Sequence, residues 1–129
     1  MKKTDDYKEW LSRAKSNLTL AKDTKKNNYI YYEDLCFDAQ QCAEKSFKAL
    51  CIYNNIPFPK THDIYYLIDI LEKGGINIPS KIRIAGDLSD YSSETRYPGD
   101  YEEVDEKEYK RVIKIAEDVF NWVSKKINI

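Results

Sequence analysis

Apolar residues recur at steps of three and four along most of this chain, a spacing typical of amphipathic α-helices. The clearest example is the stretch 35–53, which contains neither proline nor glycine. Its apolar stripe includes alanines and cysteines, which let neighbouring helices approach closely. We assign its charged residues, among them Glu44 and Lys48 in the order that favours an ion pair, to the exposed surface. This stretch is predicted to be the central helix of the fold.

Turn signals divide the rest of the chain into further helical segments. The first expected helix runs from about Asp5 to Lys25, and the second is opened by the tyrosines of 29–32 and ends near Asn54. Two short helices follow, one with Thr61 as N-cap and His62 in its first turn and one after Pro79. A long helix from about Asp105 is the last. The predicted fold class is all-α: a single domain over residues 1–129, folded as an up-and-down helical bundle. About five helices are expected, three long and two short, with mostly antiparallel neighbours.

The composition is that of a globular protein. Charged residues make up 33% and apolar residues 42% of the 129 positions, and the formal net charge is −1. This charge gives no overall attraction to nucleic acid, so an RNA site would have to be a local patch. The N-terminus has no apolar signal-peptide core and no run reaches membrane-spanning length. We therefore expect a cytoplasmic protein with no membrane association.

Neither the cysteines nor the histidine suggests a metal site, and no cofactor is expected. Cys36, Cys42 and Cys51 have spacings that match no metal-binding or redox motif. We expect inert core thiols, with a reactive cysteine as the minor alternative. His62 is the only histidine, and no second histidine or cysteine is placed to join it on a metal ion. It is interpreted either as an ordinary polar residue at a helix start or as an acid–base group.

The segment DYSSETRYPGD, residues 90–100, interrupts the helical pattern and has more chemical variety than any other connection. Arg96 offers a planar guanidinium that can bind phosphate. The competing interpretation is that Arg96 holds the loop through an ion pair with Asp90, Glu94 or Asp100. Tyr97 is interpreted more readily as a packed loop aromatic than as a residue that stacks on a base.

Four pieces of sequence occur together in one order. They are Trp10 with Ala14 and Leu18, AQQCAEKSFKAL at 39–50, KTHDIYYLI at 60–68 and TRYPG at 95–99. In this combination the chain resembles the HEPN domain family (higher eukaryotes and prokaryotes nucleotide-binding) over nearly its whole length. The resemblance implies a homodimer, often encoded beside a minimal nucleotidyltransferase as a toxin–antitoxin pair.

The resemblance also points to a site. Many HEPN proteins are metal-independent ribonucleases that use an arginine and a histidine a few positions later, from both subunits of the dimer. Arg96 with Tyr97 matches the start of that motif, but the positions for the histidine hold Tyr101, Glu102 and Glu103. A tyrosine hydroxyl, with an ordinary pKa of about 10, is a poor general base, and carboxylates repel phosphate.

Two hypotheses follow from this departure. The first is a catalytically degenerate HEPN dimer that pairs with a minimal nucleotidyltransferase and binds nucleotide or RNA phosphate through Arg96 and Tyr97. The alternative is an active ribonuclease toxin in which Arg96 works with a displaced acid–base group, His62 or Tyr101. In some relatives the partner enzyme modifies a tyrosine two positions after the histidine. Here that position holds Glu103, so modification of the nearby Tyr101 is a separate hypothesis.

Overall fold

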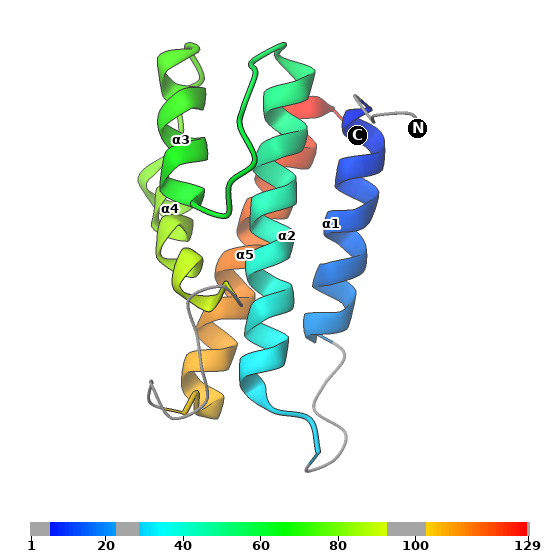
Figure 1. Cartoon of the computed structure of the whole chain (residues 1–129), viewed down its shortest axis with the longest axis vertical. Coiled ribbons are helices and arrows are strands. Elements are labelled where there is room, and N and C mark those ends of the chain that lie inside the picture. The colour runs from blue at the N-terminus through cyan, green and yellow to red at the C-terminus, as the bar shows by residue number, and fades with distance from the viewer. Residues whose placement is uncertain (1–5, 23–28, 93–102, 129) are drawn as a thin grey trace.

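The computed structural model describes residues 6–22, 29–92 and 103–128. Every regular element in these ranges is a helix (Figure 1). The elements are α1 (Tyr7–Lys22), α2 (Tyr32–Tyr53), α3 (Ile64–Lys73), α4 (Ser80–Arg83), the 3-10 helix η1 (Ile84–Tyr91) and α5 (Glu106–Ile127). The predicted all-α class, with long first, second and last helices, is confirmed.

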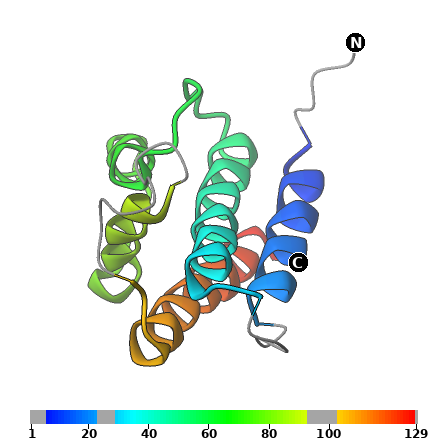
Figure 2. The same ribbon diagram turned by 60° about the horizontal axis from the view of Figure 1, so that its bottom comes forward.

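The central helix is α2, as the periodicity predicts. It packs against α1 and α5 on one side and against α3 and η1 on the other (Figure 2). Its small and aromatic stripe residues Ala39, Cys42, Ala43 and Phe47 are fully buried. They form one core cluster with aliphatic and small side chains of the two long neighbours: Leu11, Ala14, Leu18 and Ala21 from α1, and Val112, Ala116, Val119 and Val123 from α5. Burial of this apolar area is the main source of stability.

The connection 54–63 determines where the second half of the molecule lies. Asn55 adopts a positive φ of 57° just after α2, and Pro57 and Pro59 favour an extended backbone. The connection therefore runs back along α2, and α3 starts beside the middle of α2 and points in the same direction (Figure 1). Helices α2 and α3 are therefore parallel, whereas the other successive helices are mostly antiparallel.

Two predicted helix starts are wrong by two residues. Helix α1 begins at Tyr7 rather than Asp5, because the Asp6 carboxylate accepts a hydrogen bond from the Lys8 amide at 2.8 Å. The N-cap of α3 is Asp63 rather than Thr61; the Asp63 side chain accepts from the Tyr66 amide. His62 therefore precedes α3 instead of lying in its first turn. The expected end of the first helix at Lys25 lies outside the described residues.

The predicted fourth helix is two elements. One α-helical turn, α4, continues as the 3-10 helix η1. Gly86 lies in η1 directly beneath the ring of Tyr65, and a Cβ atom on Gly86 would overlap that ring. The missing side chain lets η1 approach α3 this closely.

No helix in the described ranges combines the length and the apolar character needed to cross a membrane.

Candidate functional site

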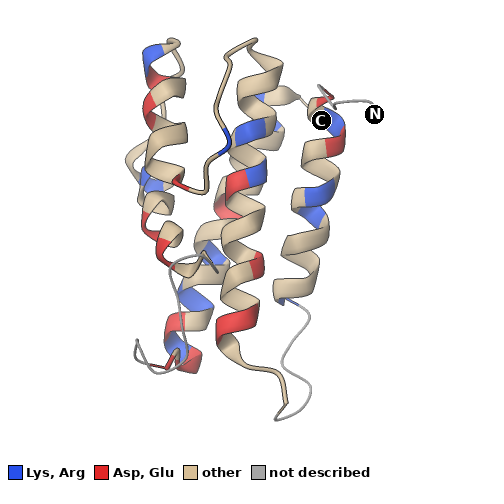
Figure 3. Cartoon of the chain, viewed as in Figure 1, with Lys and Arg blue, Asp and Glu red and all other residues tan. Residues whose placement is uncertain are grey.

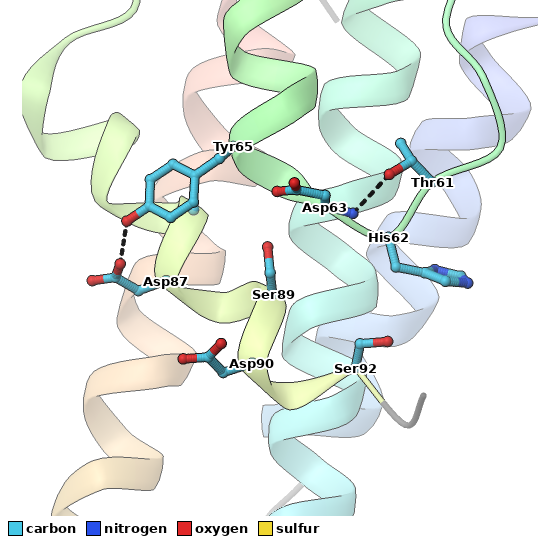
Figure 4. Close-up of a pocket in the computed structure, with 9 residues that line it drawn as sticks. Thr61, His62, Asp63, Tyr65, Asp87, Ser89, Asp90 and Ser92 are labelled. Carbon is cyan, nitrogen blue, oxygen red and sulfur yellow. Dashed lines mark hydrogen bonds between the residues drawn. The ribbon is translucent and has the colours of Figure 1, made fainter. Parts of the chain in front are cut away.

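A pocket of about 500 Å³ lies between the start of α3 and the last turns of η1 (Figure 4). Its described lining comprises Thr61, His62, Asp63, Tyr65, Gly86, Asp87, Ser89, Asp90 and Ser92. Two hydrogen bonds hold its walls together. The Ser89 hydroxyl accepts from the Ile64 amide at 2.9 Å, and the Tyr65 hydroxyl donates to Asp87. The pocket is thus formed where the N-terminus of α3 meets η1.

The described lining is acidic. Asp63, Asp87 and Asp90 contribute carboxylates, whereas none of the described lining residues is lysine or arginine. Figure 3 shows acidic positions, in red, both at the start of α3 and along η1. The pKa of Tyr65 is raised above its ordinary value. The main cause is the hydrogen bond to Asp87, and burial and the neighbouring carboxylates add to it. By itself this lining repels a phosphate, so an anionic ligand needs cations from elsewhere.

His62 lies at the rim of this pocket. Its side chain points away from Tyr65 and Asp87, as Figure 4 shows, and is 43% exposed. Its Nδ1 atom is 2.9 Å from Oε1 of Glu44, a residue of α2 that is only 3% exposed. The arrangement couples an accessible imidazole to a buried carboxylate, which is a common way to orient a histidine.

Glu44 belongs to a buried polar row on α2 that consists of Gln40, Glu44 and Lys48. Its Oε2 accepts a hydrogen bond from Lys48 Nζ at 2.8 Å, and its Oε1 accepts from Gln40 Nε2 at 2.8 Å. The Lys48 ammonium also lies 5.6 Å from the ring centre of Trp10 and 5.7 Å from that of Phe58. The three side chains of this row are therefore held by partners inside the protein.

The assignment of Glu44 and Lys48 to the exposed surface is wrong. Lys48 is 7% exposed and Gln40 is fully buried, because the 54–63 connection covers this flank of α2. Sequence reasoning missed Gln40 and Glu44 as potential site residues. The available signal was their spacing, since Gln40, Glu44 and Lys48 follow at steps of four and so line up on one face.

Of the predicted site residues, the structure places only His62. Arg96, Tyr97 and Tyr101 lie outside the described residues. Ser92, the last described residue before them, lines the same pocket as His62. Within the described ranges, no three histidine, cysteine, aspartate or glutamate side chains are grouped so that they could hold a metal ion.

The three cysteines are buried and form no disulfide with one another, as predicted for core thiols. Burial raises the pKa of Cys42 and of Cys51 from the ordinary value of 9.0 to about 12. At neutral pH both remain thiols, which are poor nucleophiles.

A second concave surface lies between α1 and α5 and has a volume of about 320 Å³. It carries two lysines, but both already have partners. Lys22 forms an ion pair with Glu117, and Lys15 lies 5.4 Å from the ring centre of Phe120. This groove is therefore a weaker candidate for anion binding than its lysines alone suggest.

Comparison with known proteins points to one family. The model of the HEPN domain matches residues 7–127. The crystal structure of ST0689, an archaeal HEPN homologue, is similar with 30% identity and a TM-score of 0.75, covering 98% of this chain and 99% of that one. The crystal structure of TT1696 from Thermus thermophilus is similar with 25% identity and a TM-score of 0.80, covering 95% and 99%. No curated protein matches the chain.

Proposed function

The chain belongs to the HEPN domain family, and on this premise we propose that it is a dimeric component of a toxin–antitoxin-like pair with a minimal nucleotidyltransferase. In this proposal the dimer binds the phosphate of a nucleotide or RNA in a cleft between its subunits, through Arg96 and Tyr97. The motif histidine is absent, so binding rather than cleavage is its activity. HEPN proteins are usually dimeric, which supports the assembly.

The observation that carries this proposal is that Ser92, a wall residue of the pocket at His62, is the last described residue before Arg96 in the sequence. The described lining of this pocket contains carboxylates and no lysine or arginine, so a phosphate bound there needs cations from elsewhere. Arg96 is four residues after Ser92, and four residues of chain span at most roughly 14 Å. An arginine tethered to the pocket wall at that distance, together with its copy from a second subunit, would supply the missing positive charge.

The proposed phosphate site is tested by binding of single-stranded RNA at several salt concentrations. We expect Arg96→Ala to weaken binding and to reduce the slope of log K against log salt by about 0.7 for each phosphate that Arg96 neutralises in the unaltered protein. Arg13→Ala is the matched control, because Arg13 is exposed on α1 and pairs with Glu9 on the same helix. Equal binding by Arg96→Ala and the unaltered protein would exclude Arg96 as the phosphate ligand.

The proposed assembly is tested by mass and by co-expression. Analytical ultracentrifugation should show a dimer at micromolar concentration, and a monomer would remove the shared cleft. Co-expression with a minimal nucleotidyltransferase encoded beside the gene should yield a stable complex. Incubation of that complex with nucleotide, followed by intact-mass measurement of the unaltered chain and Tyr101→Phe, tests whether Tyr101 is modified. Absence of any such neighbouring gene would contradict the pairing.

The second candidate function is a metal-independent ribonuclease with Arg96 and a displaced acid–base group. The observation that favours it is that His62 and Ser92 line one pocket, so the sole imidazole lies near the start of the segment that carries Arg96. An imidazole exchanges protons near neutral pH, unlike the hydroxyl of Tyr101. This places His62 ahead of Tyr101 as the candidate base.

Cleavage of structured RNA by metal-free protein separates the two candidates. Cleavage that is lost in both Arg96→Ala and His62→Asn would support the ribonuclease and exclude the binding-only function. Cleavage that survives His62→Asn but is lost in Tyr101→Phe would transfer the role to Tyr101. No cleavage at high protein concentration, in the absence of any partner, would exclude the ribonuclease.

A further inference from the structure

The buried Glu44 carboxylate has three side-chain donors or partners around it. Lys48 Nζ donates to Oε2 at 2.8 Å, Gln40 Nε2 donates to Oε1 at 2.8 Å, and His62 Nδ1 lies 2.9 Å from the same Oε1. The Glu44 side chain is 3% exposed, so water has little access to compete for these contacts. In this setting both carboxylate oxygens act as acceptors.

The direction of the bond to His62 follows from this. A carboxylate that accepts hydrogen bonds from a lysine and an amide has no proton to give, so the hydrogen between the two residues has to belong to Nδ1. In a neutral imidazole only one ring nitrogen carries hydrogen, and the other carries a lone pair. With the hydrogen at Nδ1, the lone pair is at Nε2.

We propose that Glu44 is a positioning residue that fixes His62 as the Nδ1–H tautomer and so makes Nε2 the proton-accepting atom at the pocket rim. The ligand group suited to this atom is a hydroxyl that can donate its hydrogen. The inference rests on the second candidate function, in which His62 acts on RNA, because that function needs a ring nitrogen able to accept a proton from a ribose hydroxyl.

The surrounding contacts hold Glu44 in one place. Gln40 is fully buried, and its amide oxygen accepts a hydrogen bond from Gln41 Nε2 at 2.7 Å, which orients the amide so that its nitrogen faces Glu44. On the other side, Lys48 is confined between Glu44 and the rings of Trp10 and Phe58. A carboxylate fixed from both sides sets the position of the imidazole more tightly than a solvent-exposed one.

The competing interpretation is that the contact only fastens the 54–63 connection to α2. A fastening role and a positioning role predict the same loss of stability when Glu44 is changed. They differ in whether the proton position on His62 depends on Glu44. The test therefore has to observe the imidazole itself.

Because His62 is the only histidine, long-range ¹H–¹⁵N correlation spectra of ¹⁵N-labelled protein report its tautomer without assignment ambiguity. At pH 8.5, where an ordinary imidazole is neutral, we expect the Nδ1–H form to exceed the Nε2–H form by about tenfold or more, as a hydrogen bond to a charged group implies. A predominance of Nε2–H in the unaltered protein would overturn the proposal directly.

Variants then identify Glu44 as the cause. In Glu44→Gln the amide can donate or accept, so the population of the Nε2–H form should rise severalfold. Lys48→Met is the control, since it disturbs the same buried row but leaves the Glu44 carboxylate for His62; its tautomer ratio should stay that of the unaltered protein. An unchanged ratio in folded Glu44→Gln would overturn the proposal. If Glu44→Gln does not fold, Glu44→Asp, whose carboxylate is one methylene shorter, takes its place with the same expected result.

Two readouts of one histidine variant link the tautomer to activity. Asparagine places an amide nitrogen near the position of Nδ1 and can keep the bond to Glu44, whereas it has no group at the position of Nε2. We expect His62→Asn to keep the unfolding midpoint and to lose RNA cleavage. Retained cleavage by His62→Asn would overturn the role of Nε2. The tautomer measurement needs no RNA, so the two hypotheses can fail separately. The expected tautomer without RNA cleavage would contradict only the ribonuclease function. RNA cleavage without the expected tautomer would contradict only the role of Glu44.

Discussion

The two flanks of α2 are joined to their neighbours in different ways. Toward α1 and α5, α2 presents what we call the dry flank: mainly small and aliphatic side chains, with the hydrogen bond between Asn17 and Asp38 partly buried. Toward the 54–63 connection and α3, the same helix presents a buried polar row: Gln40, Glu44 and Lys48. One helix thus serves as the core of the bundle and as the support of the candidate site.

The difference shows how stability and position are divided. Apolar contact is non-directional, and its contribution grows with buried area. A buried ion pair contributes little net stability compared with an apolar pair, yet it is costly to break and it has a defined geometry. The dry flank therefore accounts for most of the folding free energy. The polar flank fixes where the connection, and with it His62, lies.

The largest expected effect comes from breaking the dry flank. Leu50 is 1% exposed on α2, and Leu50→Ala should lower the free energy of unfolding by about 3 kcal/mol through lost burial and a cavity. Leu20 on α1 is 55% exposed, so Leu20→Ala should change the free energy of unfolding by less than about 0.5 kcal/mol. Urea unfolding followed by circular dichroism measures both. Similar losses for the two variants would contradict the described packing.

Breaking the polar flank should cost somewhat less. Lys48→Met keeps the apolar stem but leaves Glu44 without its ammonium partner, while Gln40 still donates to it and Nδ1 of His62 still lies beside it. We expect a loss of about 2 kcal/mol, below the roughly 3–5 kcal/mol seen when a buried charge is left wholly unpaired. Glu44→Gln combined with Lys48→Met should recover part of this loss in a double-mutant cycle. Strict additivity would show that the two side chains do not interact.

Alkaline pH tests the buried thiols of α2. The pKa of Cys42 and of Cys51 rises from 9.0 to about 12 on folding, so above pH 9 the unfolded chain loses protons that the folded chain keeps. Stability should be unaffected by these thiols below pH 8 and should fall as pH rises from 9 toward 12, by about 1.4 kcal/mol per pH unit for each thiol.

The raised pKa of Tyr91 and of Tyr109, caused first by burial, acts in the same direction. Urea unfolding at pH 8 and pH 10 in reducing buffer therefore measures the sum of thiols and tyrosines. Cys51→Ala, compared with the unaltered protein at both values, isolates one thiol, because its stability difference should shrink at pH 10. A pH-independent difference would contradict the burial of this group.

The smallest expected effect separates the pocket wall from the core. Ser89→Ala removes the hydroxyl that accepts from the Ile64 amide, and we expect a loss of about 1 kcal/mol, typical of a helix-capping oxygen. Ser16→Ala, at an exposed position on α1, is the matched control and should change little. Hydrogen exchange at the start of α3 should accelerate in Ser89→Ala alone. Protection equal to that of the unaltered protein would show that Ser89 does not hold η1 to α3.

The helices were predictable because their signals are local. Apolar spacing and turn residues such as Pro79 depend only on nearby residues, and they located all the helical segments, with α4 and η1 predicted as one. The burial of Glu44 and Lys48 depends instead on which flank the 54–63 connection covers, and that path is set by distant contacts. The N-cap of α3 is a different kind of miss, because the signal was local: aspartate ranks above threonine at helix N-caps, and Asp63 takes that position.

The candidate site was predictable only in part. His62 could be singled out as the sole imidazole, but its partner Glu44 is 18 residues earlier in the chain, and nothing in the local pattern joins the two. Arg96, Tyr97 and Tyr101 were singled out through family resemblance, and they remain predictions because they lie outside the described residues.

The contact between Gly86 and Tyr65 has a consequence for the evolution of this surface. Any side chain at position 86 would meet the tyrosine ring where it now lies, so the half-exposed ring would have to turn outward or be lost. Among related sequences, a residue larger than glycine at the position of Gly86 should therefore favour a small one at the position of Tyr65. Loss of the ring would also remove the hydrogen bond to Asp87. Relatives that have made this exchange should therefore differ in what their pocket admits while keeping the same helical bundle.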